Sequence, residues 1–211
     1  EAGVPVTACG LEMLVAQAVW AAEAFLDKPF ADREGEIRRS AAALRRDILN
    51  VSLVGMPSSG KTTLGRALAA ALGRPFVDLD EEIVRAAGRS IPAIFEAEGE
   101  EGFRARETEQ IRRFGKESGL LISCGGGAVK RPENVRALRQ NGLVLFIDRP
   151  LEALTVGGGR PLSSSPEALR KMEAERRPLY ERAADAAVPN DGTVEQATAR
   201  ALETLNKLFS Q

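Results

Sequence analysis

The chain has 211 residues, a formal net charge of −1, 44% hydrophobic residues and no histidine, a composition typical of a globular protein with an ordinary core. Without histidine there can be no Ser-His-Asp or Cys-His catalytic pair and no His-containing zinc site, so any general base must be Asp, Glu or Lys. The near-neutral charge predicts no nucleic-acid partner, and the lack of a long apolar run or signal-like segment predicts no membrane partner.

The first predicted elements form a helical region that does not belong with the rest of the chain. An apolar, alanine-rich helix is expected over 11–26 and ends before Pro29. A charged segment at 32–46 is expected to form a helical linker. We expect the apolar face of the first helix to pack on the rest of the chain or on a second copy, giving self-association. That face consists of Leu11, Leu14, Val15, Ala18 and Phe25.

From residue 48 onward, short apolar strands alternate with helical patterns. The predicted strands span 49–54, 76–79, 120–124, 143–148 and 186–189, and the predicted helices span 61–72, 79–87, 91–97, 101–117, 131–141, 165–183 and 193–209. This alternation predicts an α/β fold in three layers, a five-stranded parallel sheet with helices on both faces, plus the N-terminal helical appendage. In such sheets ligands bind beyond the carboxyl ends of the strands.

The first strand is followed by a glycine-bounded loop and a helix, and the loop reads Gly55-Met56-Pro57-Ser58-Ser59-Gly60-Lys61-Thr62. The two glycines let backbone N–H groups turn inward, and a helix N-terminus favours anions, so the segment predicts a triphosphate site. Lys61 is expected to reach the β- and γ-phosphates, and the Thr62 hydroxyl suits a Mg²⁺ ligand position.

Charged residues follow in two places. Asp78 and Asp80 lie at the end of the second strand. In one interpretation they form a helix N-cap and a solvated acidic first turn. In the other, one carboxylate serves a metal ion and the other faces the hydroxyl group of an acceptor. The neighbouring phosphate loop favours the second interpretation. Arg104 and Glu107 are spaced i, i+3 on a helix, and the spacing alone favours an ordinary surface ion pair over carboxylate binding by Arg104.

The third strand ends in glycines, which predict a close approach of backbone amides to a small polar ligand. These are Gly125, Gly126 and Gly127. The residue before them, Cys124, is expected to be small and buried rather than a nucleophile. Because Cys124 and Cys9 lack metal-ligand spacing, a reduced cytoplasmic setting is expected.

A Gly- and Ser-rich stretch at 157–165 predicts a mobile lid that excludes water. Within it, Arg160 would stabilise charge on a transferring phosphoryl group. The last basic pair, Arg176 and Arg177, lies near a helix, and a solvated helix face is the simpler interpretation of that pair.

Taken in order, these motifs resemble the shikimate kinase family of P-loop kinases. The resemblance covers residues 49–209 and rests on GMPSSGKTT, FVDLD, FRARE, SCGGGA, GRPL and RRPLY. It implies transfer of the γ-phosphoryl group of ATP, with Mg²⁺, to the 3-hydroxyl of shikimate, a step of aromatic amino-acid synthesis. A gluconate-type kinase and a nucleotide-binding module with impaired turnover remain as alternatives.

The resemblance also implies roles for individual residues. Asp80 matches the base or orienting group at the substrate hydroxyls, and Arg104 and Arg176 match the arginines that hold the shikimate carboxylate. The implied sets are catalytic Asp80, Lys61 and Arg160; ATP-binding Gly55, Met56, Pro57, Ser58, Ser59, Gly60, Lys61, Thr62, Thr63 and Arg160; substrate-binding Asp80, Arg104, Glu107, Gly125, Gly126, Gly127 and Arg176; and metal-binding Thr62 and Asp78.

The chain departs from the family in the lid. Family members carry a further arginine between the fourth strand and the RPL element, aimed at the phosphates, and residues 151–159 contain none. Arg149 lies too close to the end of the strand to be taken as its substitute. This missing arginine is the reason that a nucleotide-binding module with impaired turnover is kept as an alternative.

The appendage carries a second, shorter resemblance. Residues 10–18 resemble the C-terminal helix of shikimate dehydrogenase, in which the glutamine matching Gln17 contacts shikimate. The implied organisation is a dehydrogenase-like remnant at 1–30, a charged helical linker at 31–47 and a kinase domain at 48–211. We therefore expect the kinase portion of a dehydrogenase–kinase fusion, without dehydrogenase activity in this chain.

Overall fold

The computed structural model describes residues 10–154 and 166–210. The chain divides into two compact units, one formed by Glu1–Ile48 with Leu205–Gln211 and the other by Leu49–Thr204. Among the described residues, no helix combines the length and the apolar character needed to cross a membrane.

The first unit contains two paired helices, α1 (Gly10–Leu26) and α2 (Arg33–Ile48). Val15 and Val19 of α1 are buried together with Ala41 of α2, so each helix covers part of the other. Arg45 near the end of α2 forms an ion pair with Glu12 near the start of α1, at 3.0 Å, which fixes the helices antiparallel. The segment predicted as a helical linker at 32–46 is helical, and it packs against α1.

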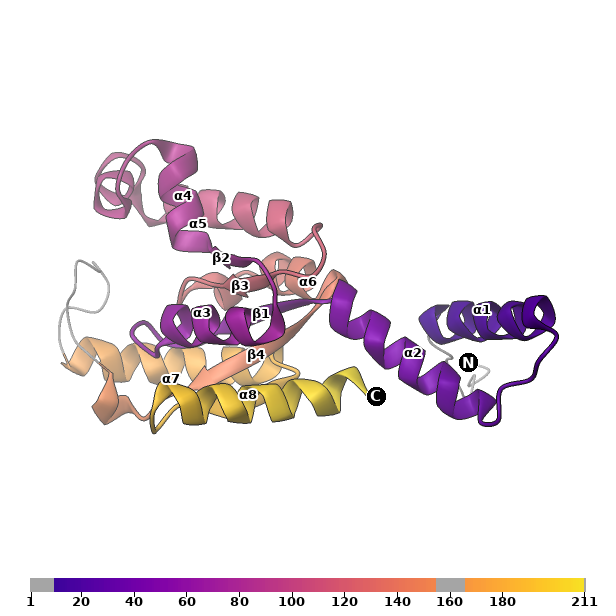
Figure 1. The fold of residues 1–211 in the computed structure, drawn as a ribbon. Coiled ribbons are helices and arrows are strands. Elements are labelled where there is room, and N and C mark those ends of the chain that lie inside the picture. Colours follow the sequence, from indigo (N-terminus) through magenta and orange to yellow (C-terminus); the bar gives the residue numbers. More distant parts are fainter. Residues whose placement is uncertain (1–9, 155–165, 211) are drawn as a thin grey trace, which may run out of the picture. The chain divides into compact units, whose positions relative to one another are not determined.

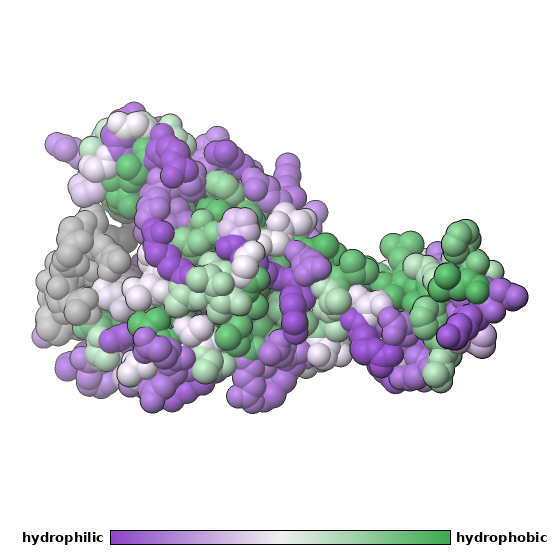
Figure 2. Space-filling model, in the orientation of Figure 1, coloured by the Kyte–Doolittle hydropathy of each residue, from purple (hydrophilic) through white to green (hydrophobic). Residues whose placement is uncertain are grey.

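The apolar face predicted for α1 is only partly covered. Leu11 and Val15 pack against α2, but Leu14 and Phe25 remain 60% and 89% exposed, and Trp20 is 55% exposed. Hydrophobic side chains are accordingly visible on the surface of this helical pair in Figure 2. Isolated apolar side chains are common at protein surfaces, but several on one helix indicate a contact surface.

The second unit is built on a parallel sheet with strand order β2-β3-β1-β4-β5. The strands are β1 (Asn50–Val54), β2 (Phe76–Asp78), β3 (Leu121–Ser123), β4 (Gly142–Asp148) and β5 (Ala186–Pro189). Each lies where the sequence predicts a strand, and the predicted α/β fold class is confirmed. In the centre, Val51 of β1 pairs with Leu121 on one side and Leu143 on the other.

Helices cover both faces of this sheet, with α3 on the near side and α6 and α7 behind it in Figure 1. The helices after β1 are α3 (Lys61–Leu72), α4 (Leu79–Ala87), α5 (Ile91–Phe114), α6 (Pro132–Gln140), α7 (Pro166–Ala183) and α8 (Val194–Phe209), with short 3₁₀ turns η1 (Ala128–Lys130) and η2 (Leu151–Ala153). The end of α8, from Leu205, belongs to the first unit. The predicted helices at 91–97 and 101–117 are joined in α5, which breaks at Gly99, where φ is 69°, and ends at Phe114. The predicted extension to residue 117 is wrong.

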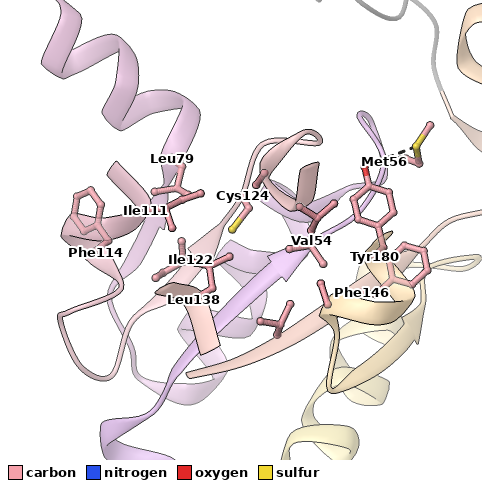
Figure 3. Packing of buried hydrophobic residues seen from close by; sticks show 14 of the residues in the cluster. Val54, Met56, Leu79, Ile111, Phe114, Ile122, Cys124, Leu138, Phe146 and Tyr180 are labelled. Atoms are coloured by element: carbon pink, nitrogen blue, oxygen red, sulfur yellow. Dashed lines mark hydrogen bonds between the residues drawn. The ribbon is translucent and has the colours of Figure 1, made fainter. Parts of the chain in front are cut away.

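The core follows from the alternation of side chains along the strands. Val54, Ile122 and Phe146 point to one face, where they pack with residues of α5, α6 and α7, as Figure 3 shows. On the opposite face, Leu53 and Leu121 lie close to Gly65 of α3. Both faces of each central strand are buried, and the carboxyl ends of β1, β2 and β3 are held side by side.

Candidate active site

The phosphate loop joins β1 to the N-terminus of α3. Gly55 has a φ of 148°, and a Cβ atom there would lie 2.6 Å from the carbonyl oxygen of Ile147, so this position requires glycine. The Lys61 ammonium folds back over the loop and donates to the carbonyl oxygens of Gly55 at 3.0 Å and Met56 at 2.8 Å. The loop thus holds its lysine against its own carbonyl oxygens, within the segment that the sequence predicted for phosphate binding.

Asp78 connects this loop to the next strand end. Its carboxylate accepts a hydrogen bond from the Thr62 hydroxyl at 2.8 Å and another from the backbone N–H of Asp80 at 3.0 Å. The second bond makes Asp78 the N-cap of α4. The helix-cap interpretation and the functional interpretation of this acidic pair are therefore compatible. The Asp78 carboxylate caps α4 with one oxygen and contacts Thr62 with the other.

The Thr62 hydroxyl and the Asp78 carboxylate are hard oxygen ligands of the kind that Mg²⁺ takes. Mg²⁺ is usually bound by one or two protein oxygens together with substrate phosphates and water. Within the described part of the chain, no group of three or more His, Cys, Asp or Glu residues forms a metal site. The residues present fit a cation that arrives with a nucleotide.

A cavity of about 630 Å³ opens next to the loop. Its walls bring together predicted site residues from five separate segments of the sequence. They are Pro57, Ser58, Gly60, Lys61, Thr62, Thr63, Asp78, Asp80, Arg104, Glu107, Gly125, Gly126, Gly127 and Arg176. Of the other predicted residues, Gly55, Met56 and Ser59 lie beneath the loop surface, and Arg160 is outside the described residues.

Arg104 and Glu107 form a buried ion pair on α5. Arg104 Nη1 donates to Glu107 Oε2 at 2.8 Å, and the side chains are only 8% and 0% exposed. Burial raises the pKa of Glu107, while the charge of Arg104 opposes that rise. Within the described structure, Glu107 Oε1 has no hydrogen-bond partner. The prediction of an ordinary surface pair, made from spacing alone, is wrong because this face of α5 turns into the cavity.

Arg176 approaches the same cavity from α7. Its Nη1 donates to the carbonyl oxygen of Gly126 at 3.0 Å, and the Tyr180 hydroxyl donates to that oxygen at 2.5 Å. Arg176 is buried, so the interpretation as a solvated helix face is wrong for it, and its Nε lacks a partner among the described residues. Burial raises the pKa of Tyr180 to about 12, so this phenol remains a donor at neutral pH.

The glycines after β3 lie against charged side chains. An added Cβ atom at Gly127 would lie 2.3 Å from Arg104 Nη1, and one at Gly125 would lie 2.5 Å from Glu107 Oε1 and 3.1 Å from Asp80 Oδ1. The backbone therefore approaches these side chains as closely as the sequence predicted. Cys124 is buried beside them, and burial raises the pKa of its thiol, in agreement with a non-nucleophilic role.

Two features of the site escaped the sequence analysis. The first is an apolar wall formed by Val84, Ile91, Pro92, Phe95 and Phe103. The rings of Phe95 and Phe103 stack at 4.8 Å between centroids, and the apolar spacing of Ile91, Ile94 and Phe95 was the signal available. The second is Asn190 after β5, whose side-chain amide donates to the Ser59 carbonyl at 2.7 Å and so fixes the phosphate loop.

The fold and the site define the class of the protein. A parallel sheet carries a glycine-bounded loop with its lysine at the N-terminus of a helix, and a threonine–aspartate pair lies beside a cavity that holds two buried arginines. This combination is that of a P-loop phosphotransferase with a small anionic acceptor site.

Comparisons with known proteins identify the family. The chain matches the family described as "Shikimate kinase" over residues 57–206. It is 44% identical over 169 residues to a shikimate kinase of Symbiobacterium thermophilum, covering 75% of this chain and 97% of that protein. It is 42% identical over 144 residues to one of Bordetella avium, covering 65% and 69%. The chain belongs to the shikimate kinase family, whose members are ATP-dependent kinases.

Solved structures support the same assignment. A structure described as shikimate kinase from Acinetobacter baumannii in complex with shikimate has a TM-score of 0.73 and 36% identity, covering 80% of this chain and 97% of that one. The shikimate kinase of Aquifex aeolicus has a TM-score of 0.69 and 33% identity, with 76% and 98% covered.

Proposed function

We propose that this protein transfers the γ-phosphoryl group of ATP to the 3-hydroxyl of shikimate. The observation that carries the proposal is that two buried arginines, Arg104 and Arg176, line the same cavity as the phosphate loop. Shikimate has one carboxylate, and each charge-assisted hydrogen bond to it contributes about 1.5–3 kcal/mol. Arg104 is oriented by Glu107 and Arg176 by the Gly126 carbonyl, so both guanidinium groups are positioned before the substrate binds.

The mechanism follows from direct in-line transfer. Asp80 lines the same cavity as the loop and the arginines, and it would align and deprotonate the acceptor hydroxyl. Lys61 would offset charge on the β- and γ-phosphates, and Thr62 with Asp78 would hold Mg²⁺, which supplies further charge neutralisation when bound. We retain Arg160 as the residue proposed to contact the nucleotide from the lid.

A coupled ADP-release assay with ATP and Mg²⁺ tests the proposal, with shikimate, gluconate and nucleoside monophosphates as acceptors. We expect turnover with shikimate alone, because the paired arginines and the apolar wall fit a compact cyclic carboxylate. Turnover with gluconate would favour the gluconate-type alternative. ATP binding without turnover on any acceptor would favour a nucleotide-binding module.

The Gly127→Ala variant tests the carboxylate site. The added methyl group would displace the Arg104 guanidinium, which is buried and tied to Glu107 and therefore has little room to move. We expect the KM for shikimate to rise by about tenfold, the cost of weakening one charge-assisted bond, while the KM for ATP stays unchanged. Steady-state kinetics in both substrates give the answer, and an unchanged shikimate KM would contradict the placement of Arg104.

We further propose that residues 1–30 are a remnant resembling the shikimate dehydrogenase C-terminus and residues 31–47 a linker, so that the kinase domain, 48–211, belongs to a dehydrogenase–kinase fusion. The helical pair has its own small core, which supports an origin separate from that of the sheet-containing unit. We also propose a cytoplasmic location, which the free thiol of Cys124 supports.

The exposed apolar residues of α1 support self-association of this chain through that helix. The Trp20→Glu variant would place a charge on the exposed surface, whereas Ala43→Glu adds the same charge on the exposed side of α2. We expect the wild type and Ala43→Glu to be dimers by light scattering after size exclusion, and Trp20→Glu to be a monomer. A monomeric wild type at tens of micromolar would rule out this association.

A further inference from the structure

Arg149 lies against the phosphate loop, although the roles proposed above do not use it. It follows β4 directly, and its Nη1 lies 3.7 Å from the position that a Cβ atom on Gly60 would occupy. Gly60 is the loop residue immediately before Lys61 and the first turn of α3. Parallel pairing of β1 with β4 brings the ends of both strands to the same edge of the sheet, which explains this proximity.

The guanidinium of Arg149 is oriented without being neutralised. Its Nε donates to the carbonyl oxygen of Ala153 in η2 at 3.1 Å, so the neighbouring turn fixes the side chain. In the described ranges, no carboxylate forms an ion pair with it. Arg177, on α7, differs in this respect because it pairs with Asp148 and with two glutamates of its own helix. A positioned arginine without a carboxylate partner is suited to bind an external anion.

The loop surface beside Arg149 is also held in place. Asn190 Nδ2 lies 2.7 Å from the same Cβ position on Gly60, and it donates to the Ser59 carbonyl oxygen at 2.7 Å. Between Arg149 and Arg160 the sequence offers no other cation, because residues 151–159 contain no lysine or arginine. A triphosphate concentrates several negative charges, and their neutralisation is a main task of a phosphotransferase site.

We propose that Arg149 binds the phosphates of the nucleotide, as a cation on the Gly60 side of the loop that complements Lys61. This inference rests on the proposed kinase function. Residues 151–159 lack the phosphate-binding arginine that the family resemblance implies for the lid. Arg149, at the end of β4, would supply a positive charge in its place. Arg149 would act mainly on nucleotide affinity, because it lies beside the loop and is not among the residues that line the acceptor cavity.

The test measures the affinity for ADP and for adenosine by calorimetry and competition. The variants are Arg149→Gln and Arg149→Lys, and Arg112→Gln is the control. Arg112 is an exposed arginine of α5. For Arg149→Gln we expect about tenfold weaker ADP binding, the loss of one charge-assisted bond, with adenosine binding and the shikimate KM unchanged. Arg149→Lys should lose less, since it keeps the charge, and Arg112→Gln should match the wild type.

Two results would overturn the inference: unchanged ADP affinity in Arg149→Gln, or equal losses for ADP and adenosine, which would indicate a structural or base-contacting role. Thermal unfolding checks that the variants are folded, and Arg149→Lys supplies the same ADP-to-adenosine comparison if Arg149→Gln is not. Failure of the kinase proposal would look different, because the wild type itself would then bind no ADP or would not phosphorylate shikimate.

Discussion

Replacing Asp80 with asparagine is expected to lower kcat with shikimate by about two to four orders of magnitude, the usual contribution of a positioned general base. The replacement keeps the shape of the side chain and removes its charge. The backbone N–H of Asp80, which caps α4 through Asp78, is unaffected. ADP affinity should therefore stay at the wild-type value, because the phosphate loop is unchanged.

Steady-state kinetics and calorimetry on the same preparation measure both quantities. Glu81→Gln is the matched control, because Glu81 is the next residue of α4 and its ion pair with Arg66 is exposed. A surface pair of this kind contributes little, about 0–1 kcal/mol to stability, so this variant should retain full activity. Normal turnover in Asp80→Asn would remove Asp80 from the mechanism, and lost ADP binding would point instead to damage of the loop.

The parts of the fold that the sequence predicted are those encoded locally. The strands are short apolar runs bounded by glycine, proline or polar residues, and each was placed within two residues of its observed ends. The phosphate loop could be predicted equally well, because the residues from Gly55 to Thr62 are consecutive and interact through their own backbone and side chains.

The parts that it missed depend on contacts between distant segments. Spacing on α5 could not reveal that Arg104 is buried, because its burial comes from the close approach of Gly127. The proximity of Arg149 to Gly60 likewise depends on strand order, which alternation alone does not give. The packing of α2 on part of α1 was not predicted, because it too depends on contacts between separate segments. A charged, alanine-rich segment reads equally as a solvated linker and as a packed helix.

The second large effect is expected from Arg104→Met, which leaves the Glu107 carboxylate buried without its ion-pair partner. Removing one partner of a buried pair costs about 3–5 kcal/mol of stability. Shikimate should also bind roughly ten- to a hundredfold more weakly, because one charge-assisted contact to its carboxylate is lost. Chemical denaturation and steady-state kinetics measure the two losses separately.

The two losses should respond differently to pH and to a second substitution. The pKa of Glu107 is raised in the folded state, so the native protein binds this proton more tightly than the unfolded chain does. The contribution of Glu107 to stability is therefore largest below its unfolded pKa and is lost as pH rises through the raised value. Without Arg104, which opposes that rise, the dependence should steepen, and Arg104→Met should recover part of its stability on mild acidification.

Adding Glu107→Gln to Arg104→Met removes the buried charge and should restore most of the stability at neutral pH. It should not restore shikimate affinity, because the guanidinium that contacts the carboxylate is still missing. This divergence separates the two roles of Arg104, since a residue that served only to neutralise Glu107 would have both properties rescued together. Recovery of the shikimate KM in the double variant would thus leave Arg176 as the sole carboxylate-binding arginine and contradict the paired site.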